Sequence, residues 1–256
     1  MSFLAHLGRN FFLFLKLTSE VTWFGLQVFL HCFRPPFYMK QVLHQFFQIG
    51  FLSLPVVGLT AIFSGMVLAL QSYTGFSRFS ADGAVASVVV LSMTRELGPV
   101  LAGLMVAGRV GAAIAAEVGT MKVTEQIDAL RTLSIDPYKY LVIPRVMAGV
   151  LMLPILVLIA DAIGILGGYL VSTYKLGFNP ANYIDQTFKI LEAQDVISGL
   201  IKASVFGYII TLFGAYFGYT SKGGAQGVGS ATTNAVVVSS IMILCANYIL
   251  TAILFT

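Results

Sequence analysis

Arg95 and Glu96 are adjacent charged residues within a long apolar stretch of the chain, SMTRELGPVLAG. Ionisable side chains inside a membrane are costly, and they commonly pair with each other or mark the path of a substrate or a proton. Such a pair could hold a polar substrate group, or Glu96 could take up a proton while its partnership with Arg95 changes. Alternatively, the two side chains only neutralise each other or a partner such as Asp161. Pro99 removes a backbone donor three residues later, which predicts a helix break or a polar cavity beside the pair.

A second group of charged residues lies between two apolar runs, over residues 117–137. Apolar and charged side chains are spaced there as in a short amphipathic helix, which we place at about residues 120–136. A helix on a membrane surface usually carries Lys and Arg on its polar face, whereas both signs are mixed here. The pattern favours a lever that inserts into a soluble partner, with a membrane-surface helix as the alternative. The residues predicted to make this contact are Glu117, Lys122, Glu125, Ile127, Asp128 and Arg131.

Motifs of hydrolytic enzymes are missing from the sequence, which has no HExxH, GxSxG or GxxxxGK[ST] pattern. Cys32 and Cys245 are far apart and the three histidines have no ligand cluster, so we expect neither a disulfide nor a metal site. We therefore predict that the chain is not an enzyme and holds no cofactor itself. A flexible connector, rather than a phosphate-binding loop, is expected at Gly223, Gly224, Gly227 and Gly229.

The composition is that of a helical integral membrane protein, with 57% hydrophobic and 10% charged residues and a mean hydropathy of +0.88. Apolar runs of about 20 residues match the thickness of a bilayer. The weak alternation of membrane-barrel strands is missing. We expect an all-α integral membrane protein whose residues 45–256 form a single transmembrane domain. Its five spans are predicted at about residues 49–72, 83–116, 141–172, 196–219 and 232–255.

The second apolar run is too long to cross a membrane as one straight, upright helix. At 1.5 Å per residue it would extend for about 50 Å, against a hydrocarbon core of about 30 Å. We therefore expect it to tilt, to break or to project from the membrane. By the same rise, Arg95 and Glu96 lie about 18 Å into the run, near the middle of the membrane.

Residues 1–44 are predicted to form an interfacial segment. The apolar stretches 3–15 and 21–33 are separated by Lys16 and Glu20 and are each too short to span a membrane, so we interpret them as two interfacial helices. Basic residues in this segment and in residues 117–139 place both on the cytosolic side, by the positive-inside rule. The N-terminus is then cytosolic, and the loops 72–83 and 173–195 lie outside.

Small residues recur every four positions on the second and fourth spans. Such rows let helix backbones approach closely, either within one chain or between two copies of it. The sequence leaves both alternatives open. The two rows are Gly103, Ala107, Gly111, Ala115 and Gly119 on the second span, and Gly199, Ala203, Gly207, Thr211 and Ala215 on the fourth.

Three ordered motifs make the chain similar to permeases of the MlaE (YrbE) family, the membrane subunits of ABC transporters that move phospholipids between Gram-negative inner and outer membranes. The central block is SMTRELGPVLAGLMVAGRVGAAIAAEVGTMKVTEQIDALRTLSIDPYKYLVIPR. GMVLALQ at residues 65–71 resembles the first-span motif, and GVGSATTNAVV at residues 227–237 resembles the one that opens the last span. The resemblance covers nearly all of the chain and is weakest before residue 45.

The resemblance implies a homodimer in the inner membrane that maintains outer-membrane lipid asymmetry, with a chloroplast-envelope homologue as the alternative for location. Each subunit would dock a cytosolic ATPase, which binds ATP and Mg²⁺, through the helix at about residues 123–133. A STAS-domain protein and a periplasmic ring of MCE-domain proteins are further implied partners, and nucleic acid is not one. By position, a lipid cavity between subunits would be lined by Leu68, Gln71, Phe76, Phe79 and Leu97 with Arg95 and Glu96 nearby, and ordinary packing is the alternative for the apolar residues.

Two other functions remain open from the sequence. A self-contained secondary carrier could use Glu96 as a proton site, although such carriers usually show repeated halves and we find no convincing repeat here. A membrane anchor that assembles other proteins would tolerate the replacement of Arg95 and Glu96 by Ala and Leu. Co-purification of an ATPase would separate the ATP-driven transporter from the carrier.

Overall fold

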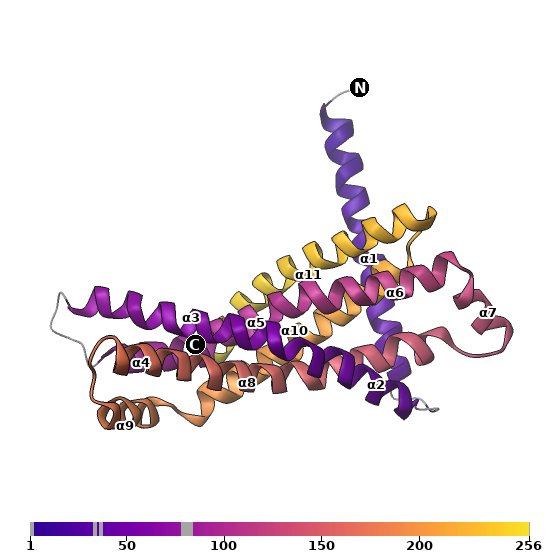
Figure 1. Ribbon diagram of the computed structural model, residues 1–256. Helices are drawn as coiled ribbons and strands as arrows, with labels where there is room; N and C mark the ends of the chain where they lie inside the picture. The colour runs from indigo at the N-terminus through magenta and orange to yellow at the C-terminus, as the bar shows by residue number, and fades with distance from the viewer. Residues whose placement is uncertain (1–2, 33–34, 36–37, 78–83, 256) are drawn as a thin grey trace.

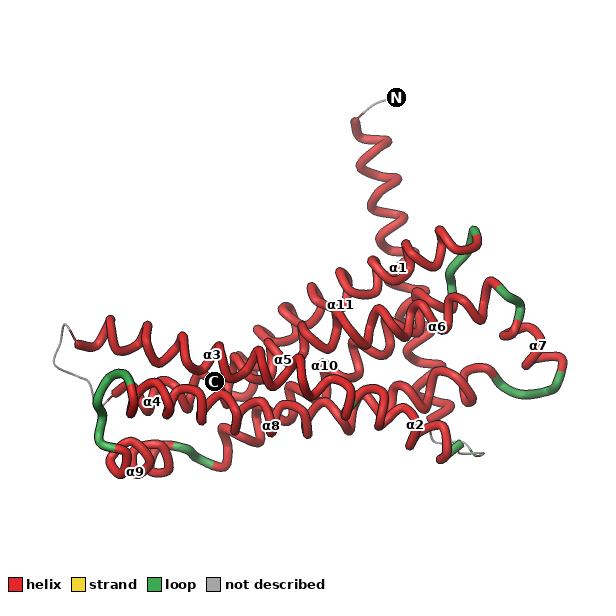
Figure 2. Tube along the Cα trace, in the orientation of Figure 1, coloured by secondary structure: helices red, strands yellow, loops and turns green. Residues whose placement is uncertain are grey.

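The computed structural model describes the chain except for residues 1–2, 33–34, 36–37, 78–83 and 256 (Figure 1). In this described part the chain consists of helices joined by short connections, without strands (Figure 2). The helices are α1 (Phe3–Cys32), α2 (Met39–Ile49), η1 (Phe51–Ser53), α3 (Leu54–Phe76), α4 (Ala84–Ser92), η3 (Met93–Leu97), α5 (Gly98–Val106), η4 (Ala107–Gly111), α6 (Ala112–Val123), α7 (Gln126–Thr132), η5 (Tyr138–Val142), α8 (Ile143–Tyr174), α9 (Pro180–Ile190), α10 (Ala193–Tyr219) and α11 (Gly224–Phe255).

Five helical segments among the described residues are long and apolar enough to cross a membrane. The all-α integral membrane fold is therefore confirmed. The segments extend beyond the predicted limits, because hydropathy marks only the part of a helix that lies in lipid. They are Met39–Phe76, Ala84–Val123, Tyr138–Tyr174, Ala193–Tyr219 and Gly224–Phe255.

The second span contains two π-helical segments, η3 and η4, which separate α4, α5 and α6. Pro99 lies in the first turn of α5, immediately after η3. The wider turn of a π-helix accommodates the residue that lacks a backbone donor. The disruption predicted from Pro99 is thus a change of helical pitch, and the helical segment continues from Ala84 to Val123.

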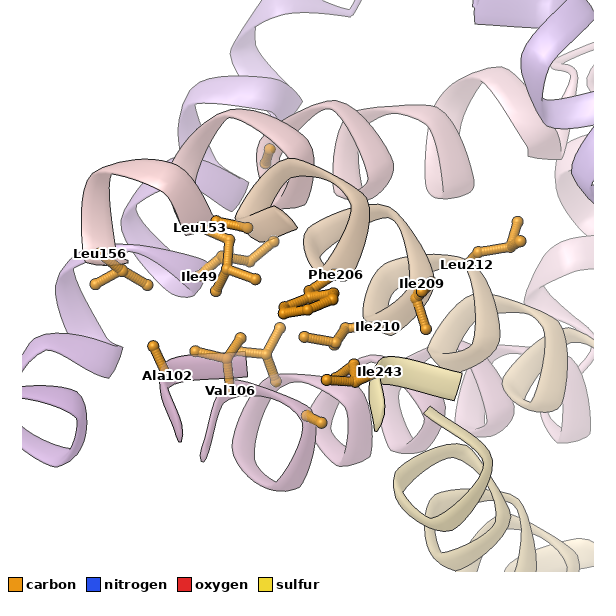
Figure 3. Close-up of a cluster of buried hydrophobic side chains, with 14 of the residues drawn as sticks. Ile49, Ala102, Val106, Leu153, Leu156, Phe206, Ile209, Ile210, Leu212 and Ile243 are labelled. Carbon is orange, nitrogen blue, oxygen red and sulfur yellow. The ribbon is translucent and has the colours of Figure 1, made fainter. Parts of the chain in front are cut away.

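The spans pack at positions where glycine removes the side chain. A Cβ on Gly65 of α3 would lie 1.9 Å from the Gly164 carbonyl of α8, and one on Gly207 of α10 would lie 2.2 Å from the Gly149 carbonyl, also of α8. Between the helices lies an apolar core, in which Phe206 and Ile210 of α10 are completely buried (Figure 3). The α8 helix therefore holds α3 and α10 in fixed register.

Both rows of small residues are used inside the chain. Gly111 on the second span faces Ile210 of α10, and Gly119 faces Ser221, just before α11, and Val228 in its first turns. On α10, Gly199 faces the Thr94 carbonyl. Packing within the chain is therefore confirmed for both rows.

The N-terminal segment contains one long helix, so the prediction of two short ones is wrong. Lys16 and Glu20, which were expected to separate them, lie one turn apart on the surface of α1 and form an i,i+4 pair at 3.9 Å. In Figure 1, α1 runs across the long helices, and its N-terminal part projects from the bundle. The interfacial placement of this segment remains a prediction.

Two connections also differ from the prediction. Gly224 opens α11, with Gly227 and Gly229 inside that helix, so the flexible connector is shorter than expected. The predicted outer loop 173–195 contains α9, which begins with Pro180 after an Asn179 cap whose side chain accepts from Ala181 and Asn182. A single hydropathy profile misses α9 because it is too polar to be a span.

Candidate functional site

The π-helical segment η3 presents Arg95 and Glu96 to α10 and α11. Arg95 forms an ion pair with Asp195, with Nη2 and Nε each 2.6 Å from Oδ1. Asp195 is buried in the first turn of α10, where its other oxygen accepts from the Glu192 backbone. The guanidinium also lies 4.7 Å from the ring centre of Phe255, in the last turn of α11. Arg95 therefore joins the second span to one end of each of the two last spans.

Glu96 is the centre of a network that crosses the same three helical segments. Its Oε1 lies 2.7 Å from Lys202 Nζ and accepts from Thr251 at 2.9 Å, and its Oε2 accepts from Asn247 at 2.8 Å. The Lys202 side chain has no exposed surface, and its ammonium also donates to the Arg95 carbonyl at 2.8 Å. Both carboxylate oxygens are thus held by donors from α10 and α11.

Arg95 and Glu96 are ion-paired, as the alternative interpretation expected, but neither pairs with the other or with Asp161. Arg95 pairs with Asp195 and Glu96 with Lys202, and both partners lie on α10. Asp161 is buried in α8, and its Oδ1 has no hydrogen-bond partner. Arg95 is also level with the first turn of α10 and the last turn of α11, rather than with the middles of these helices. Counting residues from position 83 did not reveal this offset between neighbouring helices.

Four residues of this network were not among the predicted site residues. Lys202 gave a usable signal, since it is a charge within the apolar fourth span. Asp195 was assigned to an outer loop because it lies at the end of that span. The polar residues of α11 carried no charge to mark them. The four are Asp195, Lys202, Asn247 and Thr251.

The predicted lipid-contacting residues lie on α3 and η3. Leu68, Phe76 and Leu97 are half-buried against the apolar core, whereas Gln71 is exposed. Phe79 lies outside the described residues. Packing within the chain therefore accounts for part of the surface of the three apolar residues, and Gln71 points away from the core.

At the opposite end of the bundle, α7 projects beyond the long helices (Figure 1). Lys122 at the end of α6 lies 3.0 Å from Asp128, and Arg131 lies 3.5 Å from the same carboxylate. Arg131 also donates to the hydroxyl of Tyr219, the last residue of α10. These contacts join α7 to the second and fourth spans.

The predicted loop helix is shorter than expected. Glu125 adopts a left-handed conformation, with φ of 59°, which separates α6 from the seven residues of α7. Ile127 has no exposed surface, so it anchors α7 to the chain and is not part of the exposed surface of the loop. Leu133, the last residue of the docking helix expected at about residues 123–133, is 70% exposed and follows directly after α7.

Glu117 lies on α6, the last part of the second membrane-spanning segment, rather than on the loop helix. Its carboxylate pairs with Arg145 of α8 at 2.8 Å, and the Arg145 side chain is 4% exposed. Glu117 therefore forms an ion pair that joins α6 to α8. Among the described residues, no group of three or more His, Cys, Asp or Glu side chains could hold a metal ion.

Comparison with known proteins identifies the family. The family described as Permease MlaE matches residues 42–253. A probable ABC transporter permease protein of Rickettsia bellii is 62% identical over 232 residues, covering 91% of this chain and 90% of the relative. The intermembrane phospholipid transport system permease protein MlaE of Haemophilus influenzae is 38% identical over 82% of this chain and 81% of its own length. Protein TRIGALACTOSYLDIACYLGLYCEROL 1, chloroplastic, of Arabidopsis thaliana is 38% identical over 93% of this chain and 70% of its own length. The chain therefore belongs to the MlaE permease family.

Proposed function

We propose that this permease is the membrane subunit of an ATP-driven transporter that moves phospholipids between the inner and outer membranes of a Gram-negative bacterium, and so maintains outer-membrane lipid asymmetry. The Haemophilus influenzae relative is named for intermembrane phospholipid transport, and the Rickettsia bellii relative is named as an ABC transporter permease. ATP and Mg²⁺ would bind to a separate cytosolic ATPase. The permease itself then performs no covalent chemistry and acts by changing shape.

The observation that carries the proposal is that α10 contacts both polar sites. Its last residue, Tyr219, accepts a hydrogen bond from Arg131 of α7, while Asp195 and Lys202 hold Arg95 and Glu96. From Lys202 to Tyr219 the helix extends for about 26 Å. A continuous helix can transmit a displacement of the loop over this distance to the charged network.

The exposed surface around α7 is suited to a soluble partner. Glu125, Arg131 and Leu133 are exposed there, and the paired charges of Lys122 and Asp128 stiffen the connection to α6. A partner that binds this surface differently in its ATP-bound and ATP-free states would shift the permease between two conformations, since a ligand shifts an equilibrium only by its differential affinity. Glu117 and Ile127 would act within the permease, by holding the loop.

The lipid would occupy a cavity shared by two copies of the chain. In this proposal Leu68, Phe76, Phe79 and Leu97 contact acyl chains, and Gln71 with the Arg95–Glu96 network contacts the headgroup. Arg95 supports this role, because its side chain keeps 37% exposure beside the network. Periplasmic MCE-domain proteins and a STAS-domain protein would complete the assembly, with the N-terminus in the cytosol.

The test is transport by the purified complex. The permease is isolated with its co-purifying ATPase, reconstituted into vesicles, and supplied with a fluorescent phospholipid whose transfer to acceptor vesicles is followed. We expect transfer that requires ATP and stops when Arg95 is replaced by Ala. Transfer driven by a proton gradient without ATP would establish the secondary carrier, and full activity of the Arg95→Ala, Glu96→Leu variant would establish a scaffold.

A further inference from the structure

A pocket of about 290 Å³, lined by both polar and apolar residues, lies between α2 and the second half of the second span, away from the Arg95–Glu96 network. Its walls are formed by α2 on one side and by η4 and α6 on the other. Both walls lie toward the end of the bundle that carries α7 (Figure 1). The lining side chains that matter below are His44, Gln48, Arg109, Ala113 and Glu117.

Arg109 is the cation of this pocket, and its contacts are with neutral oxygens. Nε and Nη2 donate to the Ser53 hydroxyl at 3.1 and 2.9 Å, and Nη2 also donates to the Gln48 carbonyl. Ser53 is able to accept because its own proton is donated to the Ile49 carbonyl at 2.6 Å. None of the ion pairs between described residues includes Arg109.

The charges around the pocket do not balance. Glu117 is the acidic residue of the lining, and it is already paired with Arg145 of α8 at 2.8 Å. The site therefore holds two cations, Arg109 and Arg145, and one anion, Glu117. One positive charge has no counterpart. An unbalanced cation inside a membrane-spanning segment is costly, and in membrane proteins such groups pair or bind a ligand.

We propose that this pocket binds the phosphate of a phospholipid headgroup, taken from the membrane leaflet on the α7 side. Guanidinium groups bind phosphate oxygens through short, charge-assisted hydrogen bonds. The pocket has room for a headgroup, since one water molecule occupies about 30 Å³ of liquid. Leu43 and Phe47 of α2 precede the lining residues His44 and Gln48 in the sequence, and their exposed apolar side chains offer a surface to acyl chains. The site is separate from the shared cavity of the proposed function and does not require transport.

The π-helical segment η4 explains how Arg109 reaches this position. π-Helical turns interrupt a regular helix and frequently occur at functional sites. Here the turn lies within the second span, and Arg109 extends from it to the junction of α2 and η1, where Gln48 and Ser53 are. These bonds fix the guanidinium at the edge of the pocket.

The experiment measures lipid retention by native mass spectrometry of the full-length protein in detergent. The probes are dioleoyl phosphatidylglycerol, dioleoylglycerol, which has the same chains without phosphate, and inorganic phosphate. Ala113→Leu places a larger apolar side chain in the pocket and leaves Arg109 and its partners Ser53 and Gln48 unsubstituted. Ala162→Leu is the matched control, because Ala162 is also exposed but lines the separate pocket between α8 and α9.

We expect the wild type and Ala162→Leu to retain the same number of phosphatidylglycerol molecules per protomer. Ala113→Leu should retain one fewer. Arg109→Gln should weaken retention about tenfold or more, since the loss of a charge-assisted hydrogen bond costs at least this factor. Arg109→Lys keeps the positive charge, so its phosphatidylglycerol retention should lie between that of the wild type and that of Arg109→Gln. Dioleoylglycerol should be retained equally by all of these proteins.

Three results would overturn the proposal. Equal phosphatidylglycerol retention by the wild type and Ala113→Leu would show that the pocket is not the site. If the wild type also retained more dioleoylglycerol than Ala113→Leu, by the same margin as for phosphatidylglycerol, phosphate would not be recognised. Binding of inorganic phosphate that is lost in Arg109→Gln, while phosphatidylglycerol retention stays unchanged in that variant, would assign the site to free phosphate instead. Because Ala113→Leu leaves Arg109 in place, the test remains decisive if Arg109→Gln does not fold.

Discussion

The ammonium group of Lys202 lies 2.7 Å from the Glu96 carboxylate, at a point where Lys202 has no exposed surface. It also donates to the Arg95 carbonyl and to the Thr251 hydroxyl, each at 2.8 Å. These three contacts match the three donors of an ammonium group. One side chain of α10 therefore connects the π-helical part of the second span with α11.

Replacing Lys202 by Met should destabilise the protein strongly. The change removes the cation but keeps an unbranched side chain of similar length, so Glu96 loses its ion partner. Breaking a buried ion pair costs about 3 to 5 kcal/mol, and we expect the lower end of this range because Glu96 keeps 36% exposure. Thermal unfolding of the purified protein in detergent measures the effect.

The control for this change is Lys189→Met on α9, where an exposed lysine pairs with Asp185. It should alter the free energy of unfolding by less than about 1 kcal/mol, because exposed pairs contribute little. Adding Glu96→Gln to Lys202→Met should recover part of the loss. Unchanged melting of Lys202→Met would show that the buried pair does not hold these helices together.

Hydropathy predicted the five spans because the bilayer imposes a minimum length on any helix that crosses it. It did not predict where the helices end. The helices α2 and α11 begin before the most apolar stretches of the first and last spans. The continuity of α1 was missed for a related reason. Lys16 and Glu20 were interpreted as a break, although residues four apart can pair on one helix surface.

The sequence predicted the two charged residues on the second span, but not their partners on α10 and α11. Arg95 and Glu96 stand out as charges within an apolar run, and this signal is local in sequence. Their partners depend on which turns of α10 and α11 lie beside η3, and that register is set by glycine contacts such as Gly199 against the Thr94 carbonyl. Hydropathy and charge spacing do not define this register, so Asp161 was expected as a partner and Lys202 was not.

Reversing the charge of Asp128 should uncouple α7 from the spans with little effect on stability. In Asp128→Lys the carboxylate shared by Lys122 and Arg131 is replaced by a third cation. The pairs are partly exposed, so we expect a loss of less than about 1 kcal/mol in the free energy of unfolding. If α7 is the contact to the ATPase, ATP hydrolysis should continue while lipid transfer in reconstituted vesicles falls.

The matched control is Asp185→Lys, which reverses the charge of another exposed ion pair on α9, at the opposite end of the bundle. We expect it to leave the ratio of lipid transferred to ATP hydrolysed unchanged. Equal ratios for the wild type and Asp128→Lys would exclude α7 as the coupling element.

Adding a methyl group at Gly207 should separate α8 from α10. Its Cβ would lie 2.2 Å from the Gly149 carbonyl, so one backbone must move, whereas nothing lies within 4 Å of a Cβ on Gly108. Overpacking of this kind costs about 1 to 3 kcal/mol. We expect Gly207→Ala to lower the melting temperature and Gly108→Ala to leave it unchanged or slightly higher. A similar effect of the two changes would contradict the close approach of α8 and α10.

Replacing Asp161 by Asn should stabilise the protein. The side chain is buried in α8, and its Oδ1 has no hydrogen-bond partner. Burying a carboxylate at such a site costs free energy, because the group either stays ionised or must first take up a proton. An amide of the same shape avoids both costs. We expect a gain of about 1 kcal/mol or more in thermal unfolding, with the exposed Asp185→Asn as the control without gain. A lower melting temperature for Asp161→Asn would instead show that the folded protein uses this carboxylate as a hydrogen-bond acceptor or counter-ion.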